Sequence, residues 1–367
     1  RPYKKRPTDQ QEPDINPNVD YDITLLQLLS HENISSRKPI YEKYDKQVQG
    51  RTHIETGTAD SGVMSPFNSK KYPKEIREIG IALSTDHNPR YGLIDPYWCG
   101  VNAVVESMRN VASVGATPHA ITDCLCFGNP EKPHQMWEFV EAVKGINDAC
   151  INIGLKHSPN HPTPIIAGNV SFYNESKNNA IPPSPIISCL GKIKNINKSI
   201  AMSFKNEKSE IIMIGKRKNE LGGSAFYSLY NQLGKNIPKP SLKEVKNQIF
   251  GITDCIDNEL IISCHDISDG GLATTLCEMT FENLIGCETI IDSKISNEAI
   301  LFSETGGFII ETKKENVNSI KSIFNQYNID IYNIGYTGGK KIKINNLVNI
   351  SVIDAKKSWD NGLREKL

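Results

Sequence analysis

The chain has 367 residues, which is enough for two domains with sizeable cores. Its 42 basic and 42 acidic side chains balance, so we expect no electrostatic footprint for nucleic acid or for an anionic membrane. The sequence contains no apolar run long enough to span a bilayer. The nine cysteines are odd in number and form no C-x-x-C pair, which argues against a disulfide or zinc framework and favours a reducing cytoplasm.

The first part of the chain predicts a linker followed by an α/β domain. Residues 1–20 contain four prolines among polar side chains, a composition typical of a solvated linker. The chain begins with Arg1 rather than Met, which favours a piece of a longer polypeptide. Apolar periodicity predicts helices over 103–114 and 134–155, and short apolar runs predict strands at 81–84, 120–125, 165–167 and 186–190. The alternation predicts an α/β domain over residues 21–194.

A second unit is predicted over residues 195–367. Ser224 follows two glycines and is a candidate N-cap of a helix. Helices are predicted over 272–281 and 316–327, and strands at 211–214, 261–264, 308–310 and 331–334. This order of elements is typical of an α+β domain.

Polar side chains gather where four of the apolar runs end, at 85–90, 122–133, 168–175 and 265–271. Each cluster alone is typical of a turn or a helix cap, because turns prefer Asp, Asn, Gly and Ser. His265 and Asp266 could be a satisfied pair in the core. Taken jointly, the carboxylate of Asp123 and the amide of Asn169 at neighbouring strand ends could hold a nucleotide and its Mg²⁺.

The stretch 164–175 is the most informative of these clusters. It reads as a buried strand end followed by two amides, a hydroxyl, a phenol and a carboxylate. Ligands usually lie at such strand ends in α/β proteins, and Gly168 would let a phosphate approach the backbone. The sequence has no Walker-type phosphate loop, no G-x-G-x-x-G, no G-x-S-x-G and no H-E-x-x-H. Any nucleotide site in this chain must therefore be built without these motifs.

Four motifs in order carry a family resemblance: Thr85-Asp86-x-Asn88-Pro89-Arg90, Thr122-Asp123-x-Leu125-x-Phe127-Gly128-Asn129-Pro130, Gly168-Asn169-Val170-Ser171-x-Tyr173-Asn174-Glu175 and His265-Asp266-x-Ser268-Asp269-Gly270-Gly271. With them, the chain from about residue 21 onward resembles the second half of the synthetase subunit in the phosphoribosylformylglycinamidine synthase family. The resemblance implies the fold of the aminoimidazole ribonucleotide (AIR) synthase-like superfamily. In that fold an N-terminal α/β domain forms a pseudo-dimer and is followed by a C-terminal α+β domain.

The resemblance also implies an activity. The family is an ATP-dependent ligase of purine biosynthesis that converts formylglycinamide ribonucleotide and glutamine-derived ammonia to formylglycinamidine ribonucleotide. By motif, Asp123 and Gly168 are expected to contact ATP, Asn169 to bind Mg²⁺ and Ser171 to contact substrate. The implied partners are the missing N-terminal half and a glutaminase subunit or domain, with or without a small bridging subunit.

The sequence departs from the family pattern in one respect. The catalytic-histidine segment of the first half, of the Glu-His-Cys-x-Tyr-Lys type, does not occur. The segment Thr85–Pro89 keeps one histidine where the first half has a Thr-His-Asn-His-Pro motif. We therefore expect no catalytic residue in this half, and no ligase activity from the chain alone.

Two alternatives stay open. In the first, the chain is a structural half, and the cluster at His265, Asp266 and Asp269 lines an auxiliary nucleotide site that serves stability. In the second, it is a sibling enzyme of the superfamily, such as AIR synthase or selenophosphate synthetase. The latter needs a reactive cysteine or selenocysteine near its N-terminal segment, and residues 1–98 contain no cysteine.

Overall fold

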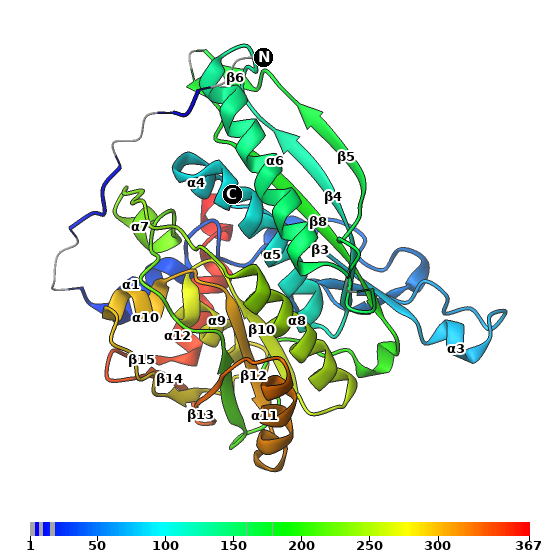
Figure 1. The fold of residues 1–367 in the computed structure, drawn as a ribbon. Coiled ribbons are helices and arrows are strands. Elements are labelled where there is room, and N and C mark those ends of the chain that lie inside the picture. Colours follow the sequence, from blue (N-terminus) through cyan, green and yellow to red (C-terminus); the bar gives the residue numbers. More distant parts are fainter. Residues whose placement is uncertain (1–3, 7–9, 15–18, 159, 178) are drawn as a thin grey trace.

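A computed structural model of the protein describes residues 4–6, 10–14, 19–158, 160–177 and 179–367. Two β-sheets organise these residues, and each sheet carries helices (Figure 1). The first sheet contains, in spatial order, β1 (Thr52–Ile54), β2 (Gly62–Met64), β3 (Gly80–Asp86), β8 (Ser184–Ile193), β4 (Thr117–Cys126) and β5 (Ile165–Ser171). Its strands pair antiparallel except for β4 and β5, which run parallel.

Two long helices pack on one face of the first sheet, α5 (Pro96–Ser113) and α6 (Pro133–Ile153). Alternation along β8 explains why: Ile187, Cys189 and Ile193 are buried in the core with these helices, and the residues between them are more exposed. On the opposite face, Leu83 is 47 % exposed. We call this opposite side the open face; its residues include Met64, Leu83, Thr85, Cys124, Cys126, Asn169, Ser171, Ser188 and Leu190.

Strand β5 differs from its prediction. The apolar run before Gly168 was expected to be a buried strand end, but six of the seven residues of β5 are exposed. Ile166 is 61 % exposed and Val170 is 50 % exposed. The physical reason is position in the sheet: β5 lies at its edge and pairs only with β4 among the described residues. Burial at this strand therefore depends on a neighbour that the described residues do not supply.

The second sheet has the spatial order β10 (Ser263–Ile267), β12 (Gly307–Thr312), β9 (Glu210–Ile214), β13 (Ile331–Thr337), β11 (Cys287–Thr289), β14 (Lys341–Ile344) and β15 (Val348–Ser351). Its interior strand β9 is apolar on both faces. Ile212 and Ile214 pack in one core with α8 (Leu242–Asp257) and α11 (Val317–Gln326). Ile211 and Met213 pack in a second core with α1 (Tyr21–Leu29), α9 (Gly271–Thr280), α10 (Asn297–Phe302) and α12 (Val352–Asn361). The sheet is thus covered on both sides at β9.

The α/β and α+β pattern predicted for the two units is confirmed, as is the N-cap at Ser224, whose side chain accepts from Tyr227 N. The predicted strand at 261–264 is displaced to β10, because the backbone of His265 to Ile267 pairs with β12 instead of forming a turn. The short elements are α2 (Lys38–Tyr41), α3 (Lys74–Arg77), α4 (Pro89–Ile94), β6 (Glu175–Ser176), β7 (Asn179–Ala180) and α7 (Ala225–Leu229). Among the described helices, none combines the length and the apolar character needed to cross a bilayer.

The described parts of the N-terminal segment are docked on the protein, in contrast to the solvated linker that its composition favours. Arg6 forms a 2.7 Å ion pair with Glu138 on α6, whose side chain is 7 % exposed. The carboxylate of Glu12 accepts from Lys235 N at 2.8 Å and from the Tyr227 hydroxyl at 2.9 Å. Helix α1, which follows, packs against α12, α9 and α7 of the second unit. A domain boundary near residue 21 stays a prediction.

Candidate functional site

The parallel strands β4 and β5 hold all four residues predicted to contact nucleotide, metal and substrate. Asp123 lies in register with Gly168, Cys124 with Asn169, and Cys126 with Ser171. Because side chains alternate along a strand, Asn169 and Ser171 face the open side of the sheet. The carboxyl of Asp123 lies on the face that the helices cover, in register with the buried Ile187. The four residues are therefore neighbours, but their side chains divide between the two faces.

Gly168 allows a close approach by the Asp123 side chain. A Cβ at this position would lie 2.4 Å from Oδ1 of Asp123, closer than any real contact. The absence of a side chain thus leaves room for the Asp123 carboxyl directly beside the strand. Burial raises the pKa of Asp123 above its usual value. A phosphate or ribose hydroxyl could reach the Gly168 backbone from the free edge of the sheet.

Ser171 is held by Asn174, a motif residue for which the sequence predicted no role. The Asn174 amide donates to the carbonyl oxygens of Phe127 and Ser171, each at 2.9 Å. The Asn174 carbonyl oxygen lies 3.2 Å from the Ser171 hydroxyl, which donates to it. Between them Tyr173 has a φ of 60°, in the left-handed region. The turn fixes the direction of the Ser171 side chain before any ligand binds.

Glu175 ties this turn to the loop after β4. Its Oε1 accepts from Lys132 Nζ at 2.8 Å and from Asn129 N at 3.2 Å. The hydrogen bond from Lys132 lowers the pKa of Glu175, and the Asn129 amide adds to the effect. Glu175 therefore links the turn that contains Asn174 to the loop after β4. Its carboxylate is already occupied by these two hydrogen bonds.

The second cluster lies between the two units, around β10. His265 Nδ1 is 2.6 Å from Asp60 Oδ1, and its Nε2 is 3.0 Å from Glu278 Oε2. Burial alone would lower the pKa of His265, but the two carboxylates outweigh it and raise the pKa well above the usual value. The predicted core pairing of His265 with Asp266 is therefore replaced by pairing with Asp60 and Glu278. Asp60 lies 205 positions away in sequence and belongs to no recognised motif, so no local signal could have found it.

Carboxylates crowd the space next to His265. Burial and mutual repulsion raise the pKa of Asp86 to about 7 and those of Asp266 and Asp269 to about 6. The same causes raise the pKa of Glu106 well above its usual value. Arg109 Nε, 3.5 Å from Asp266 Oδ2, lies within this group.

The cluster has unused oxygen ligands. Oδ2 of Asp86 and Oδ2 of Asp266 are buried and have no hydrogen-bond partner within the described ranges. Asp60, His265 and Asp266 can also place three ligand atoms within 4.8 Å of one another. A hard divalent cation would satisfy such oxygens and relieve the repulsion between them.

Stability is expected to fall as pH rises through this cluster. These carboxyls, and His265, have folded pKa values above their unfolded values, so their contribution is complete at low pH and is lost as they release their protons. Urea unfolding should give a lower free energy of unfolding at about pH 8 than at about pH 6, by at least roughly 1 kcal/mol. Asp86→Asn should flatten this dependence. A rise in stability over the same interval would contradict the assignment.

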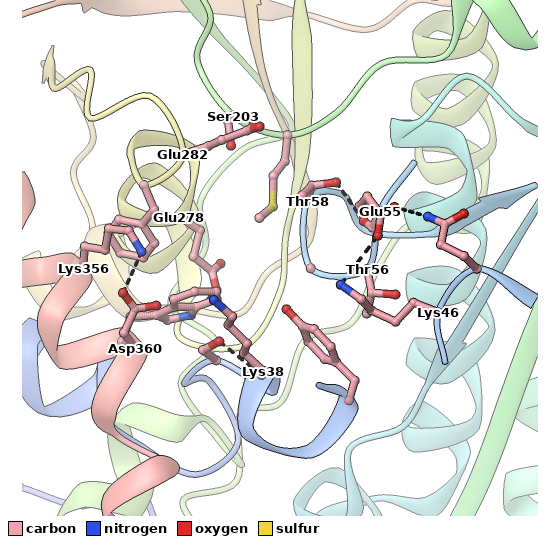
Figure 2. A pocket seen from close by; sticks show the side chains of 17 residues that line it. Lys38, Lys46, Glu55, Thr56, Thr58, Ser203, Glu278, Glu282, Lys356 and Asp360 are labelled. Atoms are coloured by element: carbon pink, nitrogen blue, oxygen red, sulfur yellow. Dashed lines mark hydrogen bonds and ion pairs between the residues drawn. The ribbon is translucent and has the colours of Figure 1, made fainter. Parts of the chain in front are cut away.

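Glu278 also lines a pocket of about 610 Å³ (Figure 2). The pocket lies between α2, the turn after β1, and helices α9 and α12. Its charged groups are already matched: Lys356 is 2.6 Å from Asp360, and Lys46 is 3.7 Å from Glu55. No excess charge selects a ligand here, and none of the predicted nucleotide-binding residues lines the pocket. The strand pair β4–β5 stays the better candidate site.

The chain is similar to known proteins over both of its units. Residues 60–193 match the N-terminal domain family of AIR synthase related proteins, and residues 207–345 match the C-terminal domain family. The chain is 40 % identical over 374 residues to the phosphoribosylformylglycinamidine synthase subunit PurL of Methanothrix thermoacetophila, covering 100 % of this chain and 48 % of that subunit. The PurL subunit of Thermomicrobium roseum is 32 % identical, with 96 % and 46 % covered.

Solved structures show the same fold. Thermotoga maritima PurL complexed with FGAR superposes with a TM-score of 0.71 at 15 % identity, covering 92 % of this chain and 53 % of that one. The PurLQS structure from the same organism gives a TM-score of 0.68 at 14 % identity, with 91 % and 51 % covered. The chain spans about half the length of the curated relatives it matches.

Proposed function

Because the chain belongs to the AIR synthase-related family and has the two-domain fold of its PurL members, we propose that it is the second half of a phosphoribosylformylglycinamidine synthase. The reaction would join glutamine-derived ammonia to formylglycinamide ribonucleotide at the expense of ATP. The observation that supports the proposal is the exposed face of strands β4 and β5, which we call the β4–β5 wall. It presents Asn169 and Ser171 on an exposed sheet face of a chain that matches only about half of its relatives.

The missing half is the proposed partner for the open face. Apolar side chains such as Leu83 and Met64, 47 % and 40 % exposed, lie on that face. Covering them would bury apolar area, the main driving force of association. The site would then be composite, with this chain as one wall and the first half, which carries the catalytic histidine in the family, as the other.

Each predicted residue has a role on this wall. Asp123 and Gly168 would hold ATP, since Gly168 lies on the exposed edge strand β5 beside the Asp123 carboxyl. Ser171, preset by Asn174, would orient the substrate. Asn169 offers one exposed amide oxygen, which fits a single position in the coordination of Mg²⁺, the rest coming from phosphates, water or the other half. Bound Mg²⁺ would offset phosphate charge while the formamide oxygen is phosphorylated and phosphate is then displaced by ammonia.

The remaining partners follow from the reaction. Ammonia must come from glutamine, so a glutaminase domain or subunit is part of the proposal. The PurLQS structure from Thermotoga maritima contains a fold relative of this chain, which supports an assembly of more than one subunit. All nine cysteines are free thiols, which suits the proposed cytoplasmic location.

An auxiliary nucleotide site is the second candidate, and the cluster at His265, Asp266 and Asp269 supports it. The specific observation in its favour is that Oδ2 of Asp86 and Oδ2 of Asp266 accept no hydrogen bond within the described ranges. They could bind cations carried by a nucleotide whose role is stability. Ca²⁺ or Mg²⁺ without nucleotide would stabilise the fold through the same oxygens.

The experiment is reconstitution. The chain and a purified first half are assayed separately and together for phosphate release with formylglycinamide ribonucleotide, ATP and ammonia. We expect no turnover from the chain alone and turnover from the mixture. Turnover by the chain alone would overturn the assignment as a half-enzyme. A stable complex of the two halves without turnover would favour the structural alternative.

A further inference from the structure

The cysteines of this protein fall into two classes. Seven of the nine are buried, and the two that are partly accessible are Cys124 and Cys126. Both lie on β4 and, two positions apart, they share the open face. Neither is used by the proposed reaction.

The two thiols are turned toward each other. Side chains two residues apart on a strand are spaced by about 6.6 Å along the backbone, whereas the two sulfur atoms are 3.7 Å apart. A tetrahedral zinc ion with Zn–S bonds of about 2.3 Å sets an S···S edge of about 3.8 Å. The two sulfur atoms therefore already lie at the separation expected for two thiolates bound to one zinc ion.

Oxygen donors stand beside the thiols. On β5, Asn169 is in register with Cys124, and Ser171 is in register with Cys126. On the other side, Ser184 of β8 is in register with Cys126. An ion held by the two sulfurs could complete its coordination with one of these side-chain oxygens and with water.

We propose that Cys124 and Cys126 form a binding site for a thiophilic divalent metal ion of the Zn²⁺ type. Binding releases the two thiol protons and forms two metal–sulfur bonds, with no oxidant or reductant. Burial, together with the neighbouring thiol, raises the pKa of Cys126, so protons compete with the ion and binding strengthens as pH rises.

The site goes beyond the proposed ligase function and would act on it. An ion at the two sulfurs lies on the same face as Asn169 and Ser171. It would compete there with Mg²⁺ and substrate. Zn²⁺ would thus be an inhibitor of the assembled enzyme rather than its cofactor.

The test is a Co²⁺ titration of the full 367-residue chain, kept reduced with a phosphine and compared with its C124S, C126S and C287A variants. Thiolate-to-cobalt charge-transfer absorption reports sulfur coordination directly. We expect one Co²⁺ per chain, displaced by Zn²⁺, with affinity at least 10-fold lower in C124S and in C126S. C287A removes a thiol that is 1 % exposed and should bind like the parent chain.

Thiol titration with an aromatic disulfide provides the second measurement. Zn²⁺ should protect two thiols in the parent chain and in C287A, and none in the double variant C124S/C126S. The proposal is overturned if the reduced parent chain gives no charge-transfer band. It is also overturned if the band survives in C124S/C126S. Because neither readout uses ATP or substrate, failure here would leave the proposed ligase function standing.

Discussion

Replacing Asn169 with alanine is expected to lower the ATP-dependent turnover of the two assembled halves by at least roughly 10–100-fold. The side chain stands on the exposed wall in register with Cys124, and alanine removes the only oxygen it can offer to Mg²⁺. Because the strand is an exposed edge strand, the shorter side chain leaves no cavity. The thermal midpoint should therefore change little while phosphate release falls.

Two variants make this result specific. Asn169→Asp keeps an oxygen ligand and should retain more turnover than alanine, with a lower Mg²⁺ requirement. Asn179→Ala removes an exposed amide from the neighbouring hairpin strand β7 and should behave like the unchanged enzyme. Full turnover by Asn169→Ala at limiting Mg²⁺ would remove Asn169 from the site.

The largest expected loss of stability comes from Arg109→Met. Arg109 is 4 % exposed, and its Nε is 3.5 Å from Asp266 Oδ2 in the crowded carboxylate cluster. Methionine keeps the length but removes one cation from the buried carboxylates, a change that typically costs about 3–5 kcal/mol. Urea unfolding at about pH 8 should show this loss. Toward pH 6 the loss should shrink, since the pKa of Asp86 is raised to about 7 and the group becomes neutral there.

Lys74→Ala is the matched control for this measurement. Lys74 forms a 3.6 Å ion pair with Glu78, but its side chain is 75 % exposed. Exposed pairs of this kind contribute at most about 1 kcal/mol. If Arg109→Met were as mild as Lys74→Ala at both pH values, the carboxylates would not be charged in the folded state.

Local sequence patterns were enough to predict those elements whose buried face depends only on residues close together in the sequence. Helix α6 was predictable because its apolar residues recur along one face, and the N-cap of α7 because Ser224 bonds to a residue three positions ahead. The exposure of β5 was not predictable. An apolar run shows that burial is favourable, but which strand lies at the edge of a sheet is decided by pairing over long sequence distances.

The same division holds for the candidate sites. The nearness of Asp123 and Asn169 was expected from adjacent strand ends, whereas the division of their side chains between two faces required the register of β4 and β5. His265 was recognised as notable, but its partner Asp60 comes from a loop in the other unit. The Cys124–Cys126 contact could not be inferred from spacing, because it depends on how both side chains lean along the strand.

Strand β5 has a practical consequence for the isolated chain. Among the described residues no strand pairs with its outer edge, which is flanked by the exposed side chains of Ile165, Ile166 and Val170. Natural sheets protect such edges with charge, proline or a covering segment, and unprotected ones recruit strands from other molecules. Produced without the other half, the chain should self-associate through this edge as its concentration rises. Measurements on the isolated chain therefore belong at low protein concentration, and co-expression of the two halves should suppress the association.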